Sequence, residues 1–120
     1  MRLFALLALL FTVSLASAMP PKAEIEALLA HLKGLDGAIF IRNGGEHSAS
    51  EAEAHLRMKW EKQNGKIATA EDFIELCGSK SSMSGERYRI RFKDGQVRFS
   101  NEVLTAQLKL LRNKNDASSQ

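Results

Sequence analysis

The chain of 120 residues contains 17 lysines and arginines, 14 acidic residues and a single cysteine. A formal net charge of +3 is too small to indicate a polyanionic partner, so we expect no nucleic acid binding from overall charge. One cysteine cannot form a disulfide within the chain, and the length allows a single small domain that is stabilised by packing.

A cleavable export signal is predicted at residues 1–18. Arg2 provides a positive start, residues 3–15 are almost wholly apolar, and the segment ends in the small residues Ala-Ser-Ala, a pattern that signal peptidase recognises. The apolar run of about 13 residues is shorter than the ~20 that a membrane-spanning helix needs, so we expect no stable membrane anchor. We therefore predict a periplasmic or secreted protein with one domain at residues 19–112 and a disordered tail at residues 113–120.

Apolar residues at helical spacing predict a first helix over residues 21–34, which ends at Gly34, a residue suited to a left-handed stop. The apolar residues 38–42 that follow predict a short strand. Asn43-Gly44 is a dipeptide that tolerates the positive φ of a tight turn, so the chain is expected to turn directly after this strand. The sequence does not indicate which strand pairs with residues 38–42.

Capping boxes predict the next two helices. Ser48 precedes Glu51 by three residues, so each side chain can bond a free backbone N–H of the other, and the helix is expected to run to about Gln63. Its apolar residues form one broad and one narrow facet, which predicts a central helix contacted from two directions. Thr69 and Asp72 repeat the capping pattern and open a short third helix.

The third helix is followed by a polar loop, residues 79–85, whose hydroxyl groups are suited to bonding nearby backbone. Cys77 precedes this loop among apolar residues, so we interpret it as a buried structural cysteine rather than a reactive thiol.

A C-terminal β-hairpin is predicted around Asp94-Gly95. A two-residue turn there would place Arg91 opposite Arg98 and all large apolar residues on one face. A last helix begins at Ser100 and carries an apolar stripe. The predicted fold class is α+β, with about four helices, a short strand and a C-terminal hairpin in a single small domain, the sheet being covered on one face by helices.

Several sequence blocks, in order, carry a resemblance to a known family. They are Phe-Ile-Arg-Asn-Gly at residues 40–44 with His47, His-Leu-Arg-Met-Lys at 55–59, Thr-Ala-Glu-Asp-Phe-Ile at 69–74, and residues 79–85 with Tyr88. Together they resemble the YfeK-like family of small periplasmic proteins, a domain of unknown function. The resemblance implies a bacterial, exported, single-domain protein and brings no reaction, cofactor or catalytic residue. The polar motif residues are Arg42, Asn43, Gly44, His47, His55 and Arg57.

The hairpin supplies the first candidate binding surface. Alternation along its first strand projects basic side chains from one face, about 7 Å apart, and a further arginine joins them across the hairpin. The simpler interpretation is a solvated basic face whose counter-charges come from Glu86, Glu102 or another element. The functional alternative is a phosphate or carboxylate ligand held by guanidinium groups and by the polar loop. The candidate residues are Arg87, Arg89, Arg91, Lys93, Arg98, Ser79, Lys80, Ser81 and Ser82.

Two other chemistries have weaker support. Glu51 and His55 share one helix face, with His47 just before the helix, but the tight histidine pair typical of zinc sites is missing, and we predict no metal and no cofactor. A serine-type hydrolase would use a serine of residues 79–85 with His47 or His55 as base. The chain has neither a Gly-x-Ser-x-Gly elbow nor a Ser-x-x-Lys motif in that loop.

The sequence therefore favours a non-enzymatic binding or interaction module outside the cytoplasm. Its expected partner is an anionic envelope component or another exported protein. This partner would bind to the basic hairpin face and to the polar loop of residues 79–85, which we call the serine loop. The alternative is a small serine-type hydrolase built on residues 79–85 and His47 or His55. A third class is an assembly subunit that pairs through a sheet edge, and the oligomeric state stays open.

Overall fold

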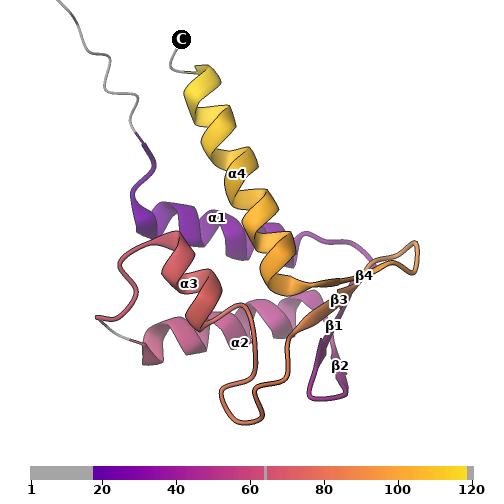
Figure 1. Ribbon diagram of the computed structural model, residues 1–120. Coiled ribbons are helices and arrows are strands. Elements are labelled where there is room, and N and C mark those ends of the chain that lie inside the picture. The colour runs from indigo at the N-terminus through magenta and orange to yellow at the C-terminus, as the bar shows by residue number, and fades with distance from the viewer. Residues whose placement is uncertain (1–17, 64, 119–120) are drawn as a thin grey trace, which may run out of the picture.

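The computed structural model of the protein describes residues 18–63 and 65–118 (Figure 1). The predicted export signal lies outside these residues except for Ala18. The elements, in chain order, are α1 (Pro21–Lys33), β1 (Ile39–Arg42), β2 (Gly45–His47), α2 (Ala49–Lys62), α3 (Ala70–Leu76), β3 (Arg89–Arg91), β4 (Val97–Phe99) and α4 (Ser100–Ser118). Within the described residues there are four helices and one four-stranded antiparallel sheet, which confirms the predicted α+β class.

The sheet has the strand order β2-β1-β3-β4, so the strand predicted at residues 38–42 lies inside it. Asn43 and Gly44 have φ values of 51° and 75°, as a tight hairpin turn requires, and they place Phe40 opposite His47. The partner strand β2 was not predicted because its sequence, Gly-Glu-His, has no apolar residue that would signal a strand.

The β3–β4 hairpin has a three-residue loop in place of the predicted two-residue turn. The N–H of Phe92 donates to the carbonyl of Gln96, and Lys93, Asp94 and Gly95 form the loop between them. Gly95 has a φ of 90°, the left-handed conformation that the last position of such a loop favours.

The longer loop shifts the strand register by one residue, so the predicted register was wrong. Arg98 lies opposite Ile90, and Arg91 lies opposite Val97. Because facing residues project from the same side of a sheet, Arg98 shares the face of the buried Ile90, while Arg91 shares the other face with Val97.

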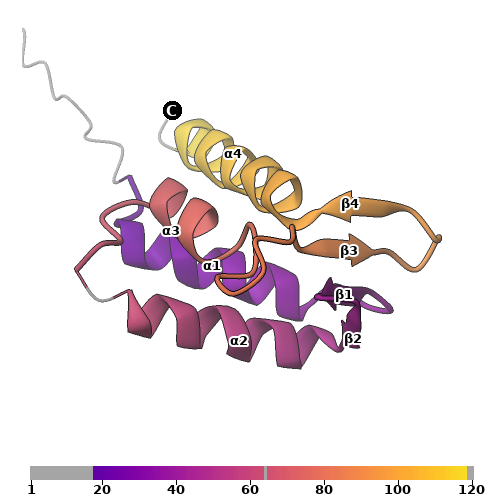
Figure 2. The ribbon, with the colours of Figure 1, turned by 60° about the horizontal axis from the view of Figure 1, so that its bottom comes forward.

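Helix α1 is the central helix of the domain. It contacts α2, α3 and α4, and lies between α2 and α4 in Figure 2, with the sheet at one end of the helical part. The fully buried side chains come from α1, α3, β3 and α4, together with Cys77, which directly follows α3. They are Ile25, Leu28, Leu29, Leu32, Phe73, Cys77, Ile90 and Leu104. Phe40 of β1 and Ile90 of β3 join this core from one sheet face. Val97 and Phe99 lie on the other face, so the prediction that all large apolar residues of the hairpin share one face was wrong.

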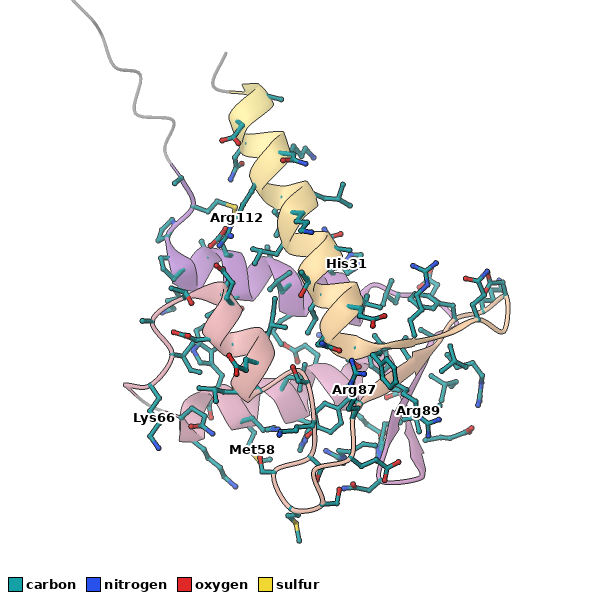
Figure 3. All side chains as sticks on the ribbon, viewed as in Figure 1. His31, Met58, Lys66, Arg87, Arg89 and Arg112 are labelled. Atoms are coloured by element: carbon teal, nitrogen blue, oxygen red, sulfur yellow. The ribbon has the colours of Figure 1, made fainter. Side chains whose placement is uncertain are left out.

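Helix α2 does not have the predicted central position. Leu56 on its broad apolar facet is buried, but Ala54 is exposed and the Met58 side chain is 41% exposed (Figure 3). The narrow facet therefore faces solvent.

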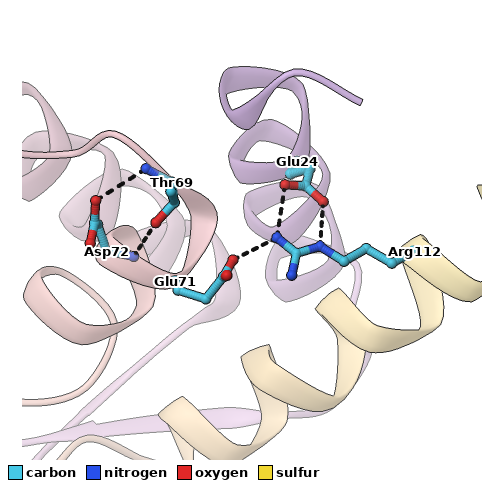
Figure 4. A network of polar contacts seen from close by, with 5 residues as sticks. All are labelled: Glu24, Thr69, Glu71, Asp72 and Arg112. Atoms are coloured by element: carbon cyan, nitrogen blue, oxygen red, sulfur yellow. Dashed lines mark hydrogen bonds and ion pairs between the residues drawn. The ribbon is translucent and has the colours of Figure 1, made fainter. Parts of the chain in front are cut away.

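The two predicted capping boxes have different outcomes. Thr69 and Asp72 form the complete box, each side chain accepting a bond from the backbone N–H of the other (Figure 4). At α2, the Ser48 hydroxyl accepts from the Glu51 N–H, but the Glu51 carboxylate contacts His47 and leaves the second half of the box unformed.

The helix ends also differ from expectation. Gly34 follows α1 with a φ of −87°, so it is not a left-handed stop, and the positive φ occurs at Gly37 instead. The tail predicted to be disordered from residue 113 is helical as far as Ser118, and residues 119–120 lie outside the described part of the chain.

An arginine of α4 joins three helices. The Arg112 guanidinium donates to the buried carboxylate of Glu24 on α1, with Nε 2.9 Å from Oε2, and also to Glu71 on α3 (Figure 4). The hydrogen bond from Arg112 lowers the pKa of Glu71. The sequence distance between these residues, 88 positions for Arg112 and Glu24, explains why no local pattern indicated the contact.

Candidate functional site

The arginines on the outer face of the hairpin are paired with carboxylates. Arg87 lies 3.9 Å from Glu102, Arg89 lies 3.9 Å from Glu86, and Arg91 lies 2.8 Å from Glu46. Figure 3 shows Arg87 and Arg89 beside the hairpin. Glu86 and Glu102 are therefore the counter-charges that the sequence suggested, and β2 supplies the third.

Of the five basic residues predicted for the hairpin face, only Arg87, Arg89 and Arg91 share it. Lys93 lies in the hairpin loop, and Arg98 projects from the opposite face, where it bonds Gln96 at 3.4 Å. The guanidinium of Arg87 is also stacked 3.4 Å from the centroid of the Phe99 ring.

The serine loop is anchored to the β1–β2 turn. The hydroxyl oxygen of Ser81, a buried residue, accepts bonds from the Asn43 amide and from the backbone N–H groups of Met83 and Ser84. Ser84 in turn donates its hydroxyl to the Asn43 side chain. Asn43 and Ser81 are 38 positions apart in sequence and belong to two of the sequence blocks named above. Their hydrogen bond thus brings these two blocks into contact.

A buried lysine, which the sequence interpretation missed, lies beneath this loop. Lys59 of α2 is only 7% exposed, and its Nζ donates to the Lys80 carbonyl at 2.9 Å and to the Tyr88 hydroxyl at 3.0 Å. An ammonium group has three donors, so one N–H of Lys59 has no hydrogen-bond partner among the residues described, although Nζ also lies 4.9 Å from the centroid of the Tyr88 ring. No carboxylate of residues 18–63 and 65–118 forms an ion pair with it.

The same tyrosine contacts His55. Its hydroxyl lies 3.2 Å from Nε2 of His55. Because Lys59 can only donate, the Tyr88 oxygen accepts from lysine, and its own proton is available to the histidine ring. Burial, followed by the positive charges of Arg42 and Lys59, lowers the pKa of His55 to about 4, so the ring is neutral at pH 7.

A groove of about 490 Å³ opens above these residues, within the size range of small-molecule sites. Three segments and Tyr88 line it: His55, Met58, Lys59 and Lys62 of α2, then Arg42 at the end of β1 with Asn43 of the following turn, and Ser81, Ser82 and Met83 of the loop. We call this the cationic groove. None of its lining residues is acidic, and in the described part of the chain neither Arg42 nor Lys62 forms an ion pair with a carboxylate.

The sequence-predicted residues divide between the groove and other places. Arg42, Asn43, His55, Ser81 and Ser82 line the groove. Gly44 supplies the positive φ of the turn beside it. Ser79 donates to the carbonyl of Ile74, while Lys80 contributes its backbone carbonyl to Lys59.

Arg57 has a structural role away from the groove. Its guanidinium forms two 2.8 Å bonds with the Glu26 carboxylate of α1 and also bonds Glu53 one helical turn earlier. These bonds lower the pKa of Glu26 and raise that of Arg57. The residue therefore fixes α2 against α1.

The histidines and serines do not form a hydrolytic pair in the described residues. His47 contacts Glu51 at 3.1 Å and His55 bonds Tyr88, whereas no serine of the loop hydrogen-bonds either ring. Across residues 18–63 and 65–118, no group of three histidine, cysteine or acidic side chains is placed to hold a metal ion. Cys77 is fully buried, and burial raises the pKa of its thiol.

The fold and the groove define a small α+β domain with a cationic cleft. Its sequence belongs to a family of unknown function, DUF5329, whose model matches residues 19–112. The chain is also similar to the uncharacterized protein YfeK of Salmonella typhimurium (strain LT2), with 40% identity over 67 residues. That alignment covers 56% of each chain, so it spans about half the length of the relative. The predicted resemblance to the YfeK-like family is confirmed.

No solved structure matches this chain. Among its described residues, no helix has both the length and the apolar character needed to span a membrane.

Proposed function

We propose that this protein is an exported, non-enzymatic module that binds an anionic ligand in the cationic groove. The observation that carries the proposal is the charge arrangement there. Arg42, Lys59 and Lys62 line one cleft, and no carboxylate among the described residues forms an ion pair with any of them. Neighbouring like charges repel, and a phosphate or carboxylate bound between them would supply the missing counter-charge.

The donors that line the groove suit oxygen ligands. Arg42 offers a planar guanidinium that can bond two oxygens at once. Lys59 is held by two hydrogen bonds and has one remaining N–H, so little side-chain entropy is lost when it bonds a ligand. Ser82, another residue that lines the groove, adds a hydroxyl group.

The groove is a better candidate than the hairpin face because the hairpin arginines already face carboxylates. A ligand at Arg91 would have to displace Glu46, whereas Arg42 has no ion pair among the described residues that a ligand would have to break. A hydrolase has less support, since the loop serines bond Asn43 and backbone groups instead of a histidine. Labelling of the protein by a serine-directed fluorophosphonate would favour the hydrolase.

Export is supported by the order of residues 1–18, in which a basic residue, an apolar run and small residues follow one another. An extracytoplasmic protein would meet phosphate and carboxylate groups of envelope components. Amino-terminal sequencing of protein recovered from the cell envelope is expected to begin at Met19. An intact chain that starts at Met1 and stays in the cytoplasm would contradict export.

Calorimetric titration with inorganic phosphate at low salt tests the groove. Replacing two unpaired cations, Arg42→Gln with Lys62→Gln, is expected to weaken binding by at least about tenfold, because each charge-assisted bond contributes more than one kcal/mol. The matched control, Arg89→Gln with Arg91→Gln, removes the same charge from the hairpin and is expected to change affinity less than about twofold. Equal losses in both variants, or no phosphate binding by the wild type, would contradict the proposal.

A further inference from the structure

We propose that the anion bound in the cationic groove carries an alkyl chain, so that the ligand class is an anionic amphiphile. This inference rests on the proposed function and adds the chemistry of the ligand's second part. It starts from two methionines that line the same groove as the unpaired cations. Met83 is 96% exposed and Met58 is 41% exposed.

The exposure of Met83 is built into the loop. Its backbone N–H donates to the buried Ser81 hydroxyl, which also accepts a bond from Asn43. The loop conformation that presents the methionine is therefore held by the same side chains that attach the loop to the β1–β2 turn. A large apolar side chain held in water in this way has unused contact area, and an apolar ligand group would cover it.

Helix α2 combines both chemistries along one stripe. His55, Met58, Lys59 and Lys62 recur at the three- and four-residue spacing that places side chains on one helix face, and all four line the groove. Met58 is thus a neighbour of Lys62 one turn further along (Figure 3 labels Met58). A ligand whose head group contacts Lys62 would place an attached chain within reach of Met58.

Methionine suits an alkyl chain better than a ligand of fixed shape. Its unbranched thioether side chain adapts to chains of different length and conformation. The groove, at about 490 Å³, has room for a head group together with a chain. The recognition is therefore divided, with Arg42, Lys59 and Lys62 binding the head group and Met58 and Met83 contacting the chain.

The experiment is a chain-length series measured on the purified protein: inorganic phosphate, butyl phosphate and octyl phosphate, all below micelle formation. Each methylene that the methionines cover is expected to raise affinity by up to about fourfold. Because coverage is partial, octyl phosphate is expected to bind at least about tenfold more tightly than inorganic phosphate. Replacing both side chains, Met58→Ser with Met83→Ser, should flatten the series, because the affinity for octyl phosphate falls much more than the affinity for inorganic phosphate. The matched control is Leu110→Ser, which removes another exposed apolar side chain, 61% exposed on α4, outside the groove.

The outcomes separate this inference from the function on which it rests. If phosphate binding needs Arg42 and Lys62 but affinity does not rise with chain length, the ligand is not an amphiphile. The anion site proposed above is then still supported. A rising series that the methionine variant does not flatten also overturns the amphiphile. Absence of binding to every member of the series overturns both.

One alkyl phosphate chemistry can come from a lipid headgroup in a bilayer or from a free amphiphile. A second arm uses vesicles of phosphatidylglycerol in phosphatidylcholine, with pure phosphatidylcholine vesicles as reference. If the wild type sediments with the anionic vesicles and the methionine variant does not, the ligand is an anionic amphiphile that belongs to a bilayer. If the protein binds octyl phosphate but not the vesicles, the ligand is a free anionic amphiphile.

Discussion

The hairpin arginines and the cations of the groove differ in what faces them. On the hairpin, Arg87, Arg89 and Arg91 each lie within 4 Å of a glutamate. In the groove, Arg42 and Lys62 pair with no carboxylate of the described residues. The hairpin looks the more basic of the two along the sequence, since its arginines alternate within one short segment. The comparison teaches that the partner of a charge, which only the fold supplies, decides whether that charge is available to a ligand.

If this comparison is correct, removing a paired cation should cost stability and removing an unpaired one should not. The largest effect is expected for Arg112→Met, which keeps the aliphatic stem but leaves the buried Glu24 carboxylate without its donor. Hydrogen bonds to charged groups contribute about 1.5–3 kcal/mol when buried, and the half-exposed arginine reduces this, so we expect a loss of about 1–2 kcal/mol. Urea unfolding monitored by Trp60 fluorescence measures it. A loss of stability no larger than that of Arg91→Met, which removes an exposed ion pair of the hairpin, would contradict a special role for Arg112.

The next effect concerns pH and the neutral histidine of the groove. The pKa of His55 is lowered from 6.5 to about 4, so between these values the unfolded chain binds a proton that the folded chain does not. Stability should therefore fall as pH decreases from about 6.5 to about 4. His55→Gln should remove the part of the slope that His55 contributes and leave the part from His31, whose pKa burial also lowers, whereas the lowered pKa values of Glu26 and Glu71 act at lower pH. A pH profile unchanged by the substitution would contradict the assignment.

The same histidine reports which cations lie near it. The positive charge of Arg42 contributes to the lowered pKa of His55, so Arg42→Met should raise that pKa, as followed by NMR titration of the ring protons. Arg91→Met is the matched control, because Arg91 is not among the charges that act on His55, and it should leave the pKa unchanged. A pKa of His55 that changes in Arg91→Met and not in Arg42→Met would contradict the position of Arg42 beside His55.

The smallest effect is expected in the stability of these two single variants. Arg91→Met removes an exposed ion pair with Glu46 and should cost at most about 0.5 kcal/mol. Arg42→Met removes repulsion from Lys59 and Lys62 and should leave the free energy of unfolding unchanged or slightly higher. Urea unfolding of both variants at low and at high salt tests the sign, since salt should reduce both differences.

The sequence predicted the elements that local patterns encode. The Thr69–Asp72 capping box, the Asn43-Gly44 turn and the buried Cys77 were all found where residues within a few positions determine the conformation. The hairpin register failed because the identity of Asp94-Gly95 fits both a two-residue and a three-residue loop.

The candidate site was predicted as separate pieces. The sequence singled out Arg42, His55 and the serine loop, but it gave no indication that they line one groove. Lys59 was missed because its burial depends on the Lys80 carbonyl and the Tyr88 hydroxyl, 21 and 29 positions away. The pairing of Arg91 with Glu46, 45 positions apart, was equally hidden, and this made the hairpin look like the better site.

Binding of phosphate in the cationic groove is tested residue by residue in an NMR titration of the isotope-labelled protein with inorganic phosphate, in which every backbone amide is followed. We expect saturable shifts at the amides of Asn43, Ser82 and Met83, which border the cationic groove, and no saturable shifts in β3 and β4. Saturable shifts centred on Arg89 and Arg91, with the groove amides unchanged, would contradict it.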